Sequence, residues 1–350
     1  MKIIVINNTR YVAGSGNKFS YKLPQSTNFE LGSKVGVVGV SIYNSTFNIG
    51  SSRGNNTLTL VWNAPALTNP TTNGSTASGS TQITLNSTSS CTIGATITAT
   101  NIPANTTITA INGSVITISQ ATTAIIATAS TITITNFVYN WTIPDGYYTI
   151  SDLNYWLQSM FITNALYATT TAGNVYFYDF LLNSIRYKVQ VDSYYIPTSA
   201  TATTLGYTIA SGALWTYPAS AQTPQISWGS SFGTLIGLGA QTFPSTVQST
   251  NQSTISTSTP IINPVNSYLM TCNLINSRYS IPNDTFYTIP VSGAIGSLIT
   301  TSNNSLIMSD ITPRQYDTID ITFYDQQWNA LQLQDNEVVI TLAIEEVYLN

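Results

Sequence analysis

Carboxylates gather near the C-terminus of this chain, and they are the residues whose types could support chemistry. More than half of the 14 acidic residues lie after residue 309, with Arg314 as the one basic residue among them: Asp310, Asp317, Asp320, Asp325, Asp335, Glu337, Glu345 and Glu346. Paired carboxylates can hydrolyse glycosides, and several carboxylate oxygens together can bind calcium. Either chemistry requires that the folded chain bring the carboxylates together.

The spacing of these carboxylates argues against both kinds of site. Asp317 and Asp320 are three residues apart on a predicted strand, so we expect them to face opposite sides and not to pair locally. Asp325 and Asp335 flank a predicted turn, where aspartate commonly accepts hydrogen bonds from nearby backbone. We therefore interpret the carboxylates as solvated turns and an acidic rim. A glycoside hydrolase or polysaccharide lyase would lose activity in the variants Asp317→Asn or Asp325→Asn, and we expect no such activity.

Other catalytic signatures are missing from the sequence. The chain has no histidine, which excludes Ser-His-Asp and Cys-His catalysis and His-ligated zinc. It has neither a GxxxxGK[ST] motif nor a GxGxxG motif that leads into a helix. Residues 229–240, GSSFGTLIGLGA, hold spaced glycines but no charge to assist a phosphate, and we interpret them as packed turns. We predict no enzyme, no cofactor and no metal.

Two long stretches carry no Asp, Glu, Lys or Arg: Gly54 to Pro144 and Ser193 to Ser277. Charged residues make up 7% of the chain, against about 25% in typical soluble proteins. The stretches are rich in Thr, Ile, Val and Tyr, which favour β-sheet, and their composition does not match that of disordered chains. The net charge of −4 permits close packing among copies, and the lack of any Lys/Arg run argues against direct binding of nucleic acid.

Two cysteines, Cys91 and Cys272, lie far apart in the sequence. They could pair, but nothing in the sequence demands it, and we expect two buried free thiols. The apolar run at the start, MKIIVINNTR, is interrupted at Asn7, so we predict no signal peptide. No window approaches 18 apolar residues, so we expect no membrane-spanning helix.

Period-two alternation of apolar residues is the main signal for secondary structure near the N-terminus. Residues 2–7 and 18–23 flank a glycine-rich turn and predict a hairpin. Residues 35–49 predict a strand with Val38, Val40 and Ile42 on one face, and residues 56–62 predict another strand.

The C-terminal region alternates in the same way. Residues 316–325 and 336–349 predict strands, and the second places Val338, Ile340, Leu342 and Ile344 on one face. The segment between them, 325–336, predicts a turn and a short strand. We therefore expect a C-terminal meander of antiparallel strands.

One segment, residues 149–160, predicts a helix. Thr149 or Ser151 supplies an N-cap, and Asp152 lies at the positive end of the helix dipole. An apolar stripe follows at positions i, i+3, i+4 and i+7: Leu153, Trp156, Leu157 and Met160. We expect this helix to close an open end of the β-structure through simple core packing.

Residues 64–136 differ in texture from the segments on either side. A polar run is followed by short alternating strands, and the flanking segments 58–62 and 137–141 look like two adjacent strands. We predict a separate small β-module inserted on a loop, where few contacts cross the junction. A second zone, 197–265, is rich in loops.

Several segments together resemble the single jelly-roll penton (vertex) capsid proteins of virophages, polinton-like elements and large nucleocytoplasmic DNA viruses. Each motif is weak alone, and their order along the chain makes the resemblance more specific. The segments are 33–49 (SKVGVVGVSIYNSTFNI), 143–158 (IPDGYYTISDLNYWLQ), 231–244 (SFGTLIGLGAQTFP), 263–280 (NPVNSYLMTCNLINSRYS) and 311–346, which includes YDTIDITFYDQQWN.

The resemblance implies an all-β fold: a single jelly roll, that is an antiparallel β-sandwich, with one short helix and an inserted small β-domain. The jelly roll would comprise residues 1–63 and 137–350, and the insert residues 64–136. It further implies a structural protein of a double-stranded DNA virus that forms a homopentamer at the five-fold vertices of an icosahedral capsid. Its neighbours would be double-jelly-roll major capsid proteins and minor capsid proteins, and it would be assembled inside the infected host cell.

The insert resembles a β-rich segment of phage tail and decoration proteins with the pattern IPAGTTITAI. Asn105 stands in place of the usual glycine, so we expect that turn to differ. The resemblance places the insert on the virion surface, where it could bind a host-surface glycan.

Two readings of the function remain open beside the vertex role. In the vertex role, five wedge-shaped copies share heterologous edges that close as a ring. A carbohydrate-binding attachment or fibre-type virion protein would instead use Tyr and Trp on the insert or on the 197–265 loops. A minor capsid cement protein would occupy other positions of the shell.

Overall fold

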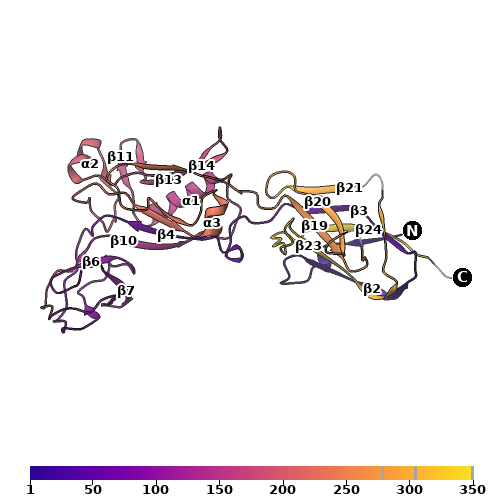
Figure 1. Cartoon of the computed structure of the whole chain (residues 1–350), viewed down its shortest axis with the longest axis horizontal. Coiled ribbons are helices and arrows are strands. Elements are labelled where there is room, and N and C mark those ends of the chain that lie inside the picture. The colour runs from indigo at the N-terminus through magenta and orange to yellow at the C-terminus, as the bar shows by residue number, and fades with distance from the viewer. Residues whose placement is uncertain (278–279, 303–305, 348–350) are drawn as a thin grey trace. The chain divides into compact units, whose positions relative to one another are not determined.

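The computed structural model describes residues 1–277, 280–302 and 306–347 and divides the chain into two compact units (Figure 1). The jelly-roll unit comprises Met1–Asn48 and Asn263–Asn350, and the inserted unit comprises Ile49–Ile262. Four residues of predicted segments lie outside the described residues: Arg278, Tyr279, Tyr348 and Leu349.

Two antiparallel sheets build the jelly-roll unit. The first sheet has the order β1-β24-β3-β21, and the short β22 also pairs with β3. The second has the order β2-β23-β19-β20. The strands of the first sheet are β1 (Lys2–Ile6), β24 (Val339–Glu345), β3 (Lys34–Tyr43), β21 (Leu298–Ser302) and β22 (Met308–Asp310). Those of the second are β2 (Lys18–Phe29), β23 (Arg314–Tyr324), β19 (Ser267–Cys272) and β20 (Thr285–Pro290).

This strand order is that of a jelly roll. With β22 left out, the strands follow one another along the chain as β1, β2, β3, β19, β20, β21, β23 and β24. The first sheet takes the first, eighth, third and sixth of them, and the second sheet takes the second, seventh, fourth and fifth. Two interlocked Greek keys produce this arrangement. The predicted all-β jelly roll is therefore confirmed.

Apolar side chains of both sheets form the core of this unit. Val338, Ile340, Leu342 and Ile344 are all buried, so the predicted inward face of the last strand is confirmed. Phe19 of β2 and Phe323 of β23 meet edge to face, with ring centroids 5.9 Å apart. Burial of the alternate residues on each strand stabilises the sandwich by about 25 cal/mol for each Å² of apolar surface removed from water.

The predicted N-terminal hairpin is wrong. The turn exists, since Val12 N donates to Lys18 O and Tyr11 forms an isolated bridge with Phe19. However, β1 pairs with β24 and β2 pairs with β23, so the two strands belong to different sheets. In a jelly roll, successive strands cross between the facing sheets and find partners far away in the sequence. The predicted C-terminal meander fails for the same reason, because β23 and β24 lie in different sheets.

The predicted inward position of Val38 is also wrong. Between β3 and β24 the register shifts, since Gly39 pairs with Thr341 whereas Val37 pairs with Leu342. Val38 is thus the extra residue of a β-bulge, and it is only half-buried. Val37 before the bulge and Val40 after it both face the core, so the bulge changes which alternate residues of β3 are buried.

The segment predicted as a turn and short strand, 325–336, contains the turn but no named strand. Its extended residues form isolated bridges, one between Ala330 and Tyr324 and one between Leu333 and Thr46. Pairing at single residues is too short to count as a strand.

Outside residues 64–136, the inserted unit contains one four-stranded sheet and two three-stranded sheets among its described residues. The four-stranded sheet has the order β10-β4-β16-β17, and the three-stranded sheets have the orders β13-β14-β18 and β12-β11-β15. The strands are β4 (Thr57–Trp62), β10 (Phe137–Thr142), β11 (Ala168–Thr170), β12 (Gly173–Val175), β13 (Tyr178–Asn183), β14 (Lys188–Ser193), β15 (Thr208–Ile209), β16 (Gln225–Trp228), β17 (Gln241–Phe243) and β18 (Gln252–Ile255). The helices are α1 (Ile150–Thr163), α2 (Ser199–Leu205) and α3 (Ser230–Leu235), and two short 3-10 turns lie at Asn8–Arg10 in the jelly-roll unit and Ser51–Arg53.

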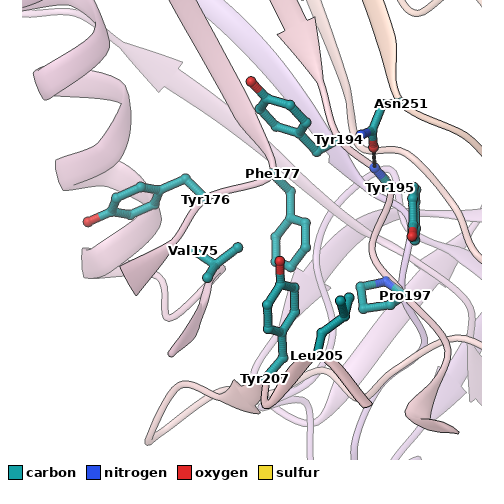
Figure 2. A pocket seen from close by; sticks show the side chains of 9 residues that line it. All are labelled: Val175, Tyr176, Phe177, Tyr194, Tyr195, Pro197, Leu205, Tyr207 and Asn251. Atoms are coloured by element: carbon teal, nitrogen blue, oxygen red, sulfur yellow. Dashed lines mark hydrogen bonds between the residues drawn. The ribbon is translucent and has the colours of Figure 1, made fainter. Parts of the chain in front are cut away.

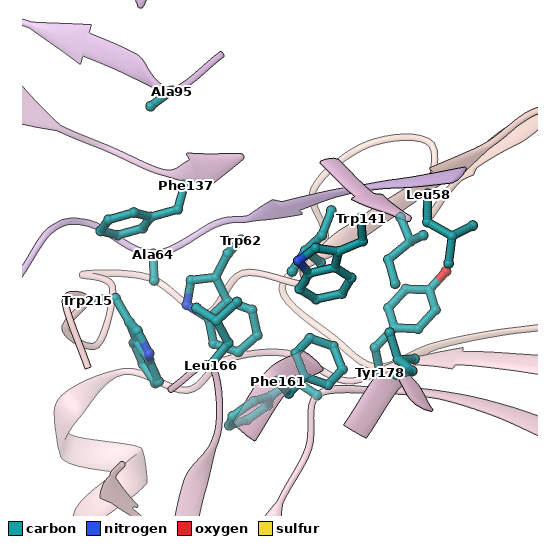
Figure 3. Packing of buried hydrophobic residues seen from close by; sticks show 14 of the residues in the cluster. Leu58, Trp62, Ala64, Ala95, Phe137, Trp141, Phe161, Leu166, Tyr178 and Trp215 are labelled. Carbon is teal, nitrogen blue, oxygen red and sulfur yellow. The ribbon is translucent and has the colours of Figure 1, made fainter. Parts of the chain in front are cut away.

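Large aromatic side chains fill the core of the inserted unit (Figure 3). Trp62 of β4 packs edge to face against Trp215 and Phe177, with ring centroids 5.1 and 5.7 Å apart. Phe161 of α1 contacts both Trp62 and Trp141. Aromatic pairs in this geometry contribute about 0.5–1.5 kcal/mol beyond the burial of their area.

The predicted helix is confirmed, but it belongs to the inserted unit. Thr149 is the N-cap and forms a capping box, in which its hydroxyl accepts from Asp152 N and the Asp152 carboxylate accepts from Thr149 N. Leu153 and Leu157 are buried as predicted, whereas Trp156 and Met160 are only partly buried. The helix packs against β13 of the same unit, so the expected core packing is confirmed within the inserted unit.

Residues 64–136 form a small sheet of their own, with the order β5-β8-β7-β6-β9. Its strands are β5 (Gln82–Thr84), β6 (Thr96–Thr98), β7 (Thr106–Asn112), β8 (Val115–Ile118) and β9 (Thr133–Ile134). Along the chain the residues of this sheet come between β4 and β10, and those two strands pair with each other as predicted. Asn105 has φ 60, the left-handed conformation that glycine adopts and asparagine tolerates, so the expected difference at this turn is not seen in its backbone.

The units divide the chain at other places than the predicted boundaries of the jelly roll. Residues 49–63 and 137–262 lie in the inserted unit, together with 64–136. The apolar residues of the small sheet, such as Ile97 and Ile134, join the same core cluster as Trp62 and Phe137. Leu67 N also donates to Leu214 O, and Thr216 N donates to Pro65 O. The segment 64–136 is therefore one part of a larger insert between β3 and β19.

Candidate functional site

The C-terminal carboxylates serve the local structure of turns and strands. Asp325 is 3% exposed, and its Oδ1 accepts hydrogen bonds from Gln327 N at 2.8 Å and Asn329 N at 2.9 Å. Its Oδ2 accepts from the Asn329 side chain at 3.0 Å. Asp335 accepts from Glu337 N at 2.9 Å. The predicted role of both aspartates in turns is confirmed.

Asp317 and Asp320 do not behave as a simple alternation predicts. The register between β2 and β23 shifts opposite this segment, between Lys22 and Thr27. Tyr316 and Ile319 are both buried, so Asp317 and Asp320 both lie outside the core instead of on opposite faces. Asp317 accepts a hydrogen bond from the Ser26 hydroxyl.

The remaining carboxylates are spread over the jelly-roll unit. Asp320 accepts from Ser20 at 2.6 Å and pairs with Lys18 at 3.5 Å, while Glu346 pairs with Lys2 at 2.8 Å. Glu337 accepts from the Asn8 side chain, and Asp310 and Glu345 are exposed. Arg314 lies over the Tyr316 ring, 4.6 Å from its centroid. Among the described residues, no group of three or more Asp, Glu, Cys or His side chains could hold a metal ion.

Both cysteines are free and buried, as predicted. Cys91 lies in the inserted unit and Cys272 in the jelly-roll unit. Burial raises the pKa of Cys91 to about 11 and that of Cys272 to about 12. Both groups are therefore neutral thiols near pH 7, a state that disfavours nucleophilic or metal-binding roles.

Strand β1 presents an apolar edge, and we call Met1, Ile3 and Val5 the β1 edge. These side chains are 77%, 57% and 53% exposed, although all three are apolar. Among the described residues β1 pairs with β24 alone, so β1 is an edge strand of its sheet. An edge strand offers unpaired backbone groups, and proteins usually protect such edges with charges, proline or a bulge.

One edge strand of the second sheet, β2, is protected in this way. β2 carries Lys18 and Lys22, and it contains Pro24 near the shift of its register with β23. On β1 the corresponding protection is limited to Lys2, which pairs with Glu346. The β1 edge is thus suited to contact with another protein surface.

The inserted unit contains a pocket of about 370 Å³ (Figure 2). Its lining comes from the ends of β12, β14, α2 and the start of β18, together with the loops beside them, and it contains no charged residue. The lining residues are Val175, Tyr176, Phe177, Tyr194, Tyr195, Pro197, Leu205, Tyr207 and Asn251. We call it the tyrosine pocket.

Hydrogen bonds and ring contacts hold the lining of the tyrosine pocket in place. Tyr194 N donates to Phe177 O at 2.9 Å, and Tyr195 N donates to Asn251 Oδ1 at 3.1 Å, the bond drawn in Figure 2. The Phe177 and Tyr207 rings meet edge to face at 6.4 Å. Burial and the nearby Asp192 raise the pKa of Tyr194 to about 12, so its hydroxyl remains protonated near neutral pH.

The sequence predicted no pocket, although the predicted 197–265 loop zone contains part of the lining of the tyrosine pocket. Pro197, Leu205, Tyr207 and Asn251 lie in the 197–265 loop zone that the attachment reading favoured. The other lining residues come from segments before this zone, and a contact between such distant segments has no periodic signature. The abundance of tyrosine, 21 residues, is the signal that was available.

No helix among the described residues is long and apolar enough to cross a membrane. No protein-family model matches the chain, and no curated protein matches it. The solved structures that show a remote likeness to this chain include the following two. The crystal structure of the selenomethionine-labelled mavirus penton protein is 10% identical, with 99% of this chain and 100% of that chain covered and a TM-score of 0.34. The cryo-EM structure of the Sputnik virophage gives 13% identity, 99% and 98% coverage and a TM-score of 0.32.

Proposed function

We propose that this chain is a structural virion protein, a penton capsomer that forms a homopentamer at the five-fold vertices of an icosahedral capsid. The observation that carries the proposal is the jelly-roll order of the first unit together with its uncovered β1 edge. The segments that resemble penton proteins support the same role. Three of the five lie wholly in the jelly-roll unit or extend from it by one residue: 33–49, 263–280 and 311–346.

The β1 edge supplies a contact between neighbouring copies. In a ring, each copy uses one surface to meet a different surface of the next copy, and the rotation closes after a fixed number of copies. Contact with the next copy would remove the exposed Ile3 and Val5 side chains from water and give the backbone groups of β1 new partners. The low charge of the chain keeps repulsion between copies small.

The other partners follow from the position at a vertex. Double-jelly-roll major capsid proteins and minor capsid proteins would surround the pentamer, and assembly would take place inside the infected host cell. The inserted unit leaves the jelly roll between β3 and β19, so the jelly-roll sheets are complete without it.

Introducing charge on the β1 edge tests the proposal. We expect the double variant Ile3→Lys/Val5→Lys to dissociate the pentamer in native mass spectrometry, because lysine ammonium groups would have to lose water in the contact. The matched control is Ile185→Lys, since Ile185 is 97% exposed in the β13–β14 connection of the inserted unit. The control should remain pentameric, and the far-UV circular dichroism spectra of all three proteins should agree, which shows that each variant is folded.

Two outcomes would count against the proposal. A wild-type chain that is a monomer or a trimer would contradict the vertex role. A pentamer that survives the double substitution would show that the copies meet through a surface other than the β1 edge.

A further inference from the structure

The tyrosine pocket has unused polar groups as well as half-buried tyrosine rings. Among the described residues, no hydrogen-bond partner exists for the hydroxyl of Tyr195 or of Tyr207. Asn251 uses its Oδ1 to accept from Tyr195 N, which leaves its amide N–H groups to donate. The pocket thus offers donors and acceptors beside aromatic surface, as Figure 2 shows for the labelled side chains.

The lining selects for an uncharged ligand. No Lys, Arg, Asp or Glu contributes to the pocket. Asp192, the nearby carboxylate, already has partners: Gln190 Nε2 donates to its two oxygens at 3.0 and 2.9 Å, and the Tyr194 hydroxyl donates to its Oδ2 at 3.4 Å. An anionic ligand would find no cation to pair with, and a cationic one would find no free carboxylate in the lining.

The volume and shape of the lining limit the ligand further. Small-molecule pockets hold roughly 300–1,000 Å³, so a pocket of about 370 Å³ suits a ligand of one or two rings. A sugar ring has an apolar face of C–H groups and a rim of hydroxyls. The C–H face packs on a tyrosine or phenylalanine ring, and the hydroxyls of the rim form hydrogen bonds with hydroxyl and amide groups.

We propose that the tyrosine pocket binds a neutral saccharide unit, stacked on its aromatic rings and hydrogen-bonded by Tyr195, Tyr207 and Asn251. This activity goes beyond assembly of the capsid and does not depend on it. The glycan site would then lie in the 175–251 region of the inserted unit instead of on the segment 64–136.

The pocket is organised before the ligand arrives. Phe177 is 1% exposed and packs edge to face against the buried Trp62, with ring centroids 5.7 Å apart. Phe177 in turn contacts Tyr207, and its backbone oxygen accepts from Tyr194 N. Side chains that are already held in place lose little entropy on binding, and this favours affinity.

The test is binding of the full chain to an immobilised panel of neutral oligosaccharides built from hexoses and N-acetylhexosamines. Sialylated glycans and a choline conjugate are included on the same panel. We expect binding to at least one neutral glycan and none to choline. Tyr207→Ala should weaken that binding by at least about tenfold through loss of a stacking ring. Tyr195→Phe and Tyr207→Phe keep the rings, and each should weaken it by about threefold to tenfold through loss of a hydroxyl.

The control variant is Tyr155→Ala, because Tyr155 is 70% exposed on α1 and does not line the pocket. It should bind like the wild type, and the melting temperature of each variant separates loss of the site from loss of the fold. Three outcomes would overturn the proposal: no binding to any neutral glycan, glycan binding that both phenylalanine variants retain in full, or preferential binding of choline or of sialylated glycans. Native mass spectrometry of the same samples reports pentamer formation separately.

Discussion

At the scale of single residues, Asp325 shows how a buried carboxylate organises a turn. It accepts from two backbone N–H groups and one side-chain amide within the segment that follows β23. We expect Asp325→Ala to lower the free energy of unfolding of the jelly-roll unit by about 2–3 kcal/mol, because it leaves these donors without a partner.

The measurement is urea unfolding followed at Trp328, which lies in the same turn and is the one tryptophan of the jelly-roll unit. Fluorine NMR of the 5-fluorotryptophan-labelled chain separates its signal from those of the other tryptophans. The control Asp317→Ala removes an exposed carboxylate and should change stability by about 0.5 kcal/mol or less. Equal losses in the two variants would contradict this account of Asp325.

The buried thiols predict how stability depends on pH. The folded chain holds the Cys272 proton more tightly than the unfolded chain, since burial raises its pKa from 9.0 to about 12. This contribution to stability is complete below pH 9 and is lost as the pH rises toward 12. The free energy of unfolding should therefore fall between pH 9 and pH 11, and it should fall less steeply in Cys272→Ala. Parallel pH profiles for the two proteins would contradict the prediction.

Residue roles were predictable where they depend on local chemistry. Asp325 and Asp335 in turns and Thr149 at a helix start follow from hydrogen bonds to nearby backbone, and the structure confirms all three. The positions of Val38 and Asp317 were not predictable, because each depends on a register shift against a strand that is distant in the sequence.

At the scale of elements, the glycine-rich segment 229–240 packs closely, as its sequence indicates, but its first half forms the short helix α3 instead of a turn. A Cβ at Gly233 would lie 2.5 Å from Leu238 O and 2.6 Å from Gly239 O, which are backbone atoms that cannot easily move. We expect Gly233→Ala to lower the stability of the inserted unit by about 1–3 kcal/mol through overpacking.

Gly239 provides a matched control in the same segment. It has no atom within 4 Å of a Cβ position and does not have a positive φ. Gly239→Ala should therefore be close to neutral in thermal unfolding. A similar loss in both variants would mean that the segment is sensitive to alanine in general and not to the close approach at Gly233.

Element types were easier to predict than their partners. Alternation located β4, β23 and β24, and a cap with an apolar stripe located α1. The same alternation cannot tell which strands lie side by side, because partners depend on the whole fold. The N-terminal hairpin failed on this point, since β1 and β2 take their partners from the last two strands of the chain.

At the scale of the whole molecule, the chain is a jelly roll interrupted by one large insert. The sequence composition distinguished residues 64–136, because their short Thr- and Ile-rich strands differ from the segments on either side. It marked 197–265 as rich in loops but indicated no boundary near residue 49 or residue 262. Only strand pairing assigns residues 49–63 and 137–262 to the inserted unit, since β4 pairs with β10 and β16.

We propose a different function for each of the two units. The jelly-roll unit carries the β1 edge that we propose joins neighbouring copies, and the inserted unit carries the tyrosine pocket that we propose binds a saccharide. Variants on one unit should therefore leave the other activity unchanged, as the Ile3→Lys/Val5→Lys and Tyr207→Phe proteins can show when each is measured in both assays.

The central claim is that copies of this chain close into a five-membered ring. Native mass spectrometry of the purified full chain tests it most directly, because the mass of the complex divided by the 37.8 kDa of one chain counts the copies. Our account predicts a predominant complex of five chains. A stable monomer or a trimer over the same range of concentrations would contradict it.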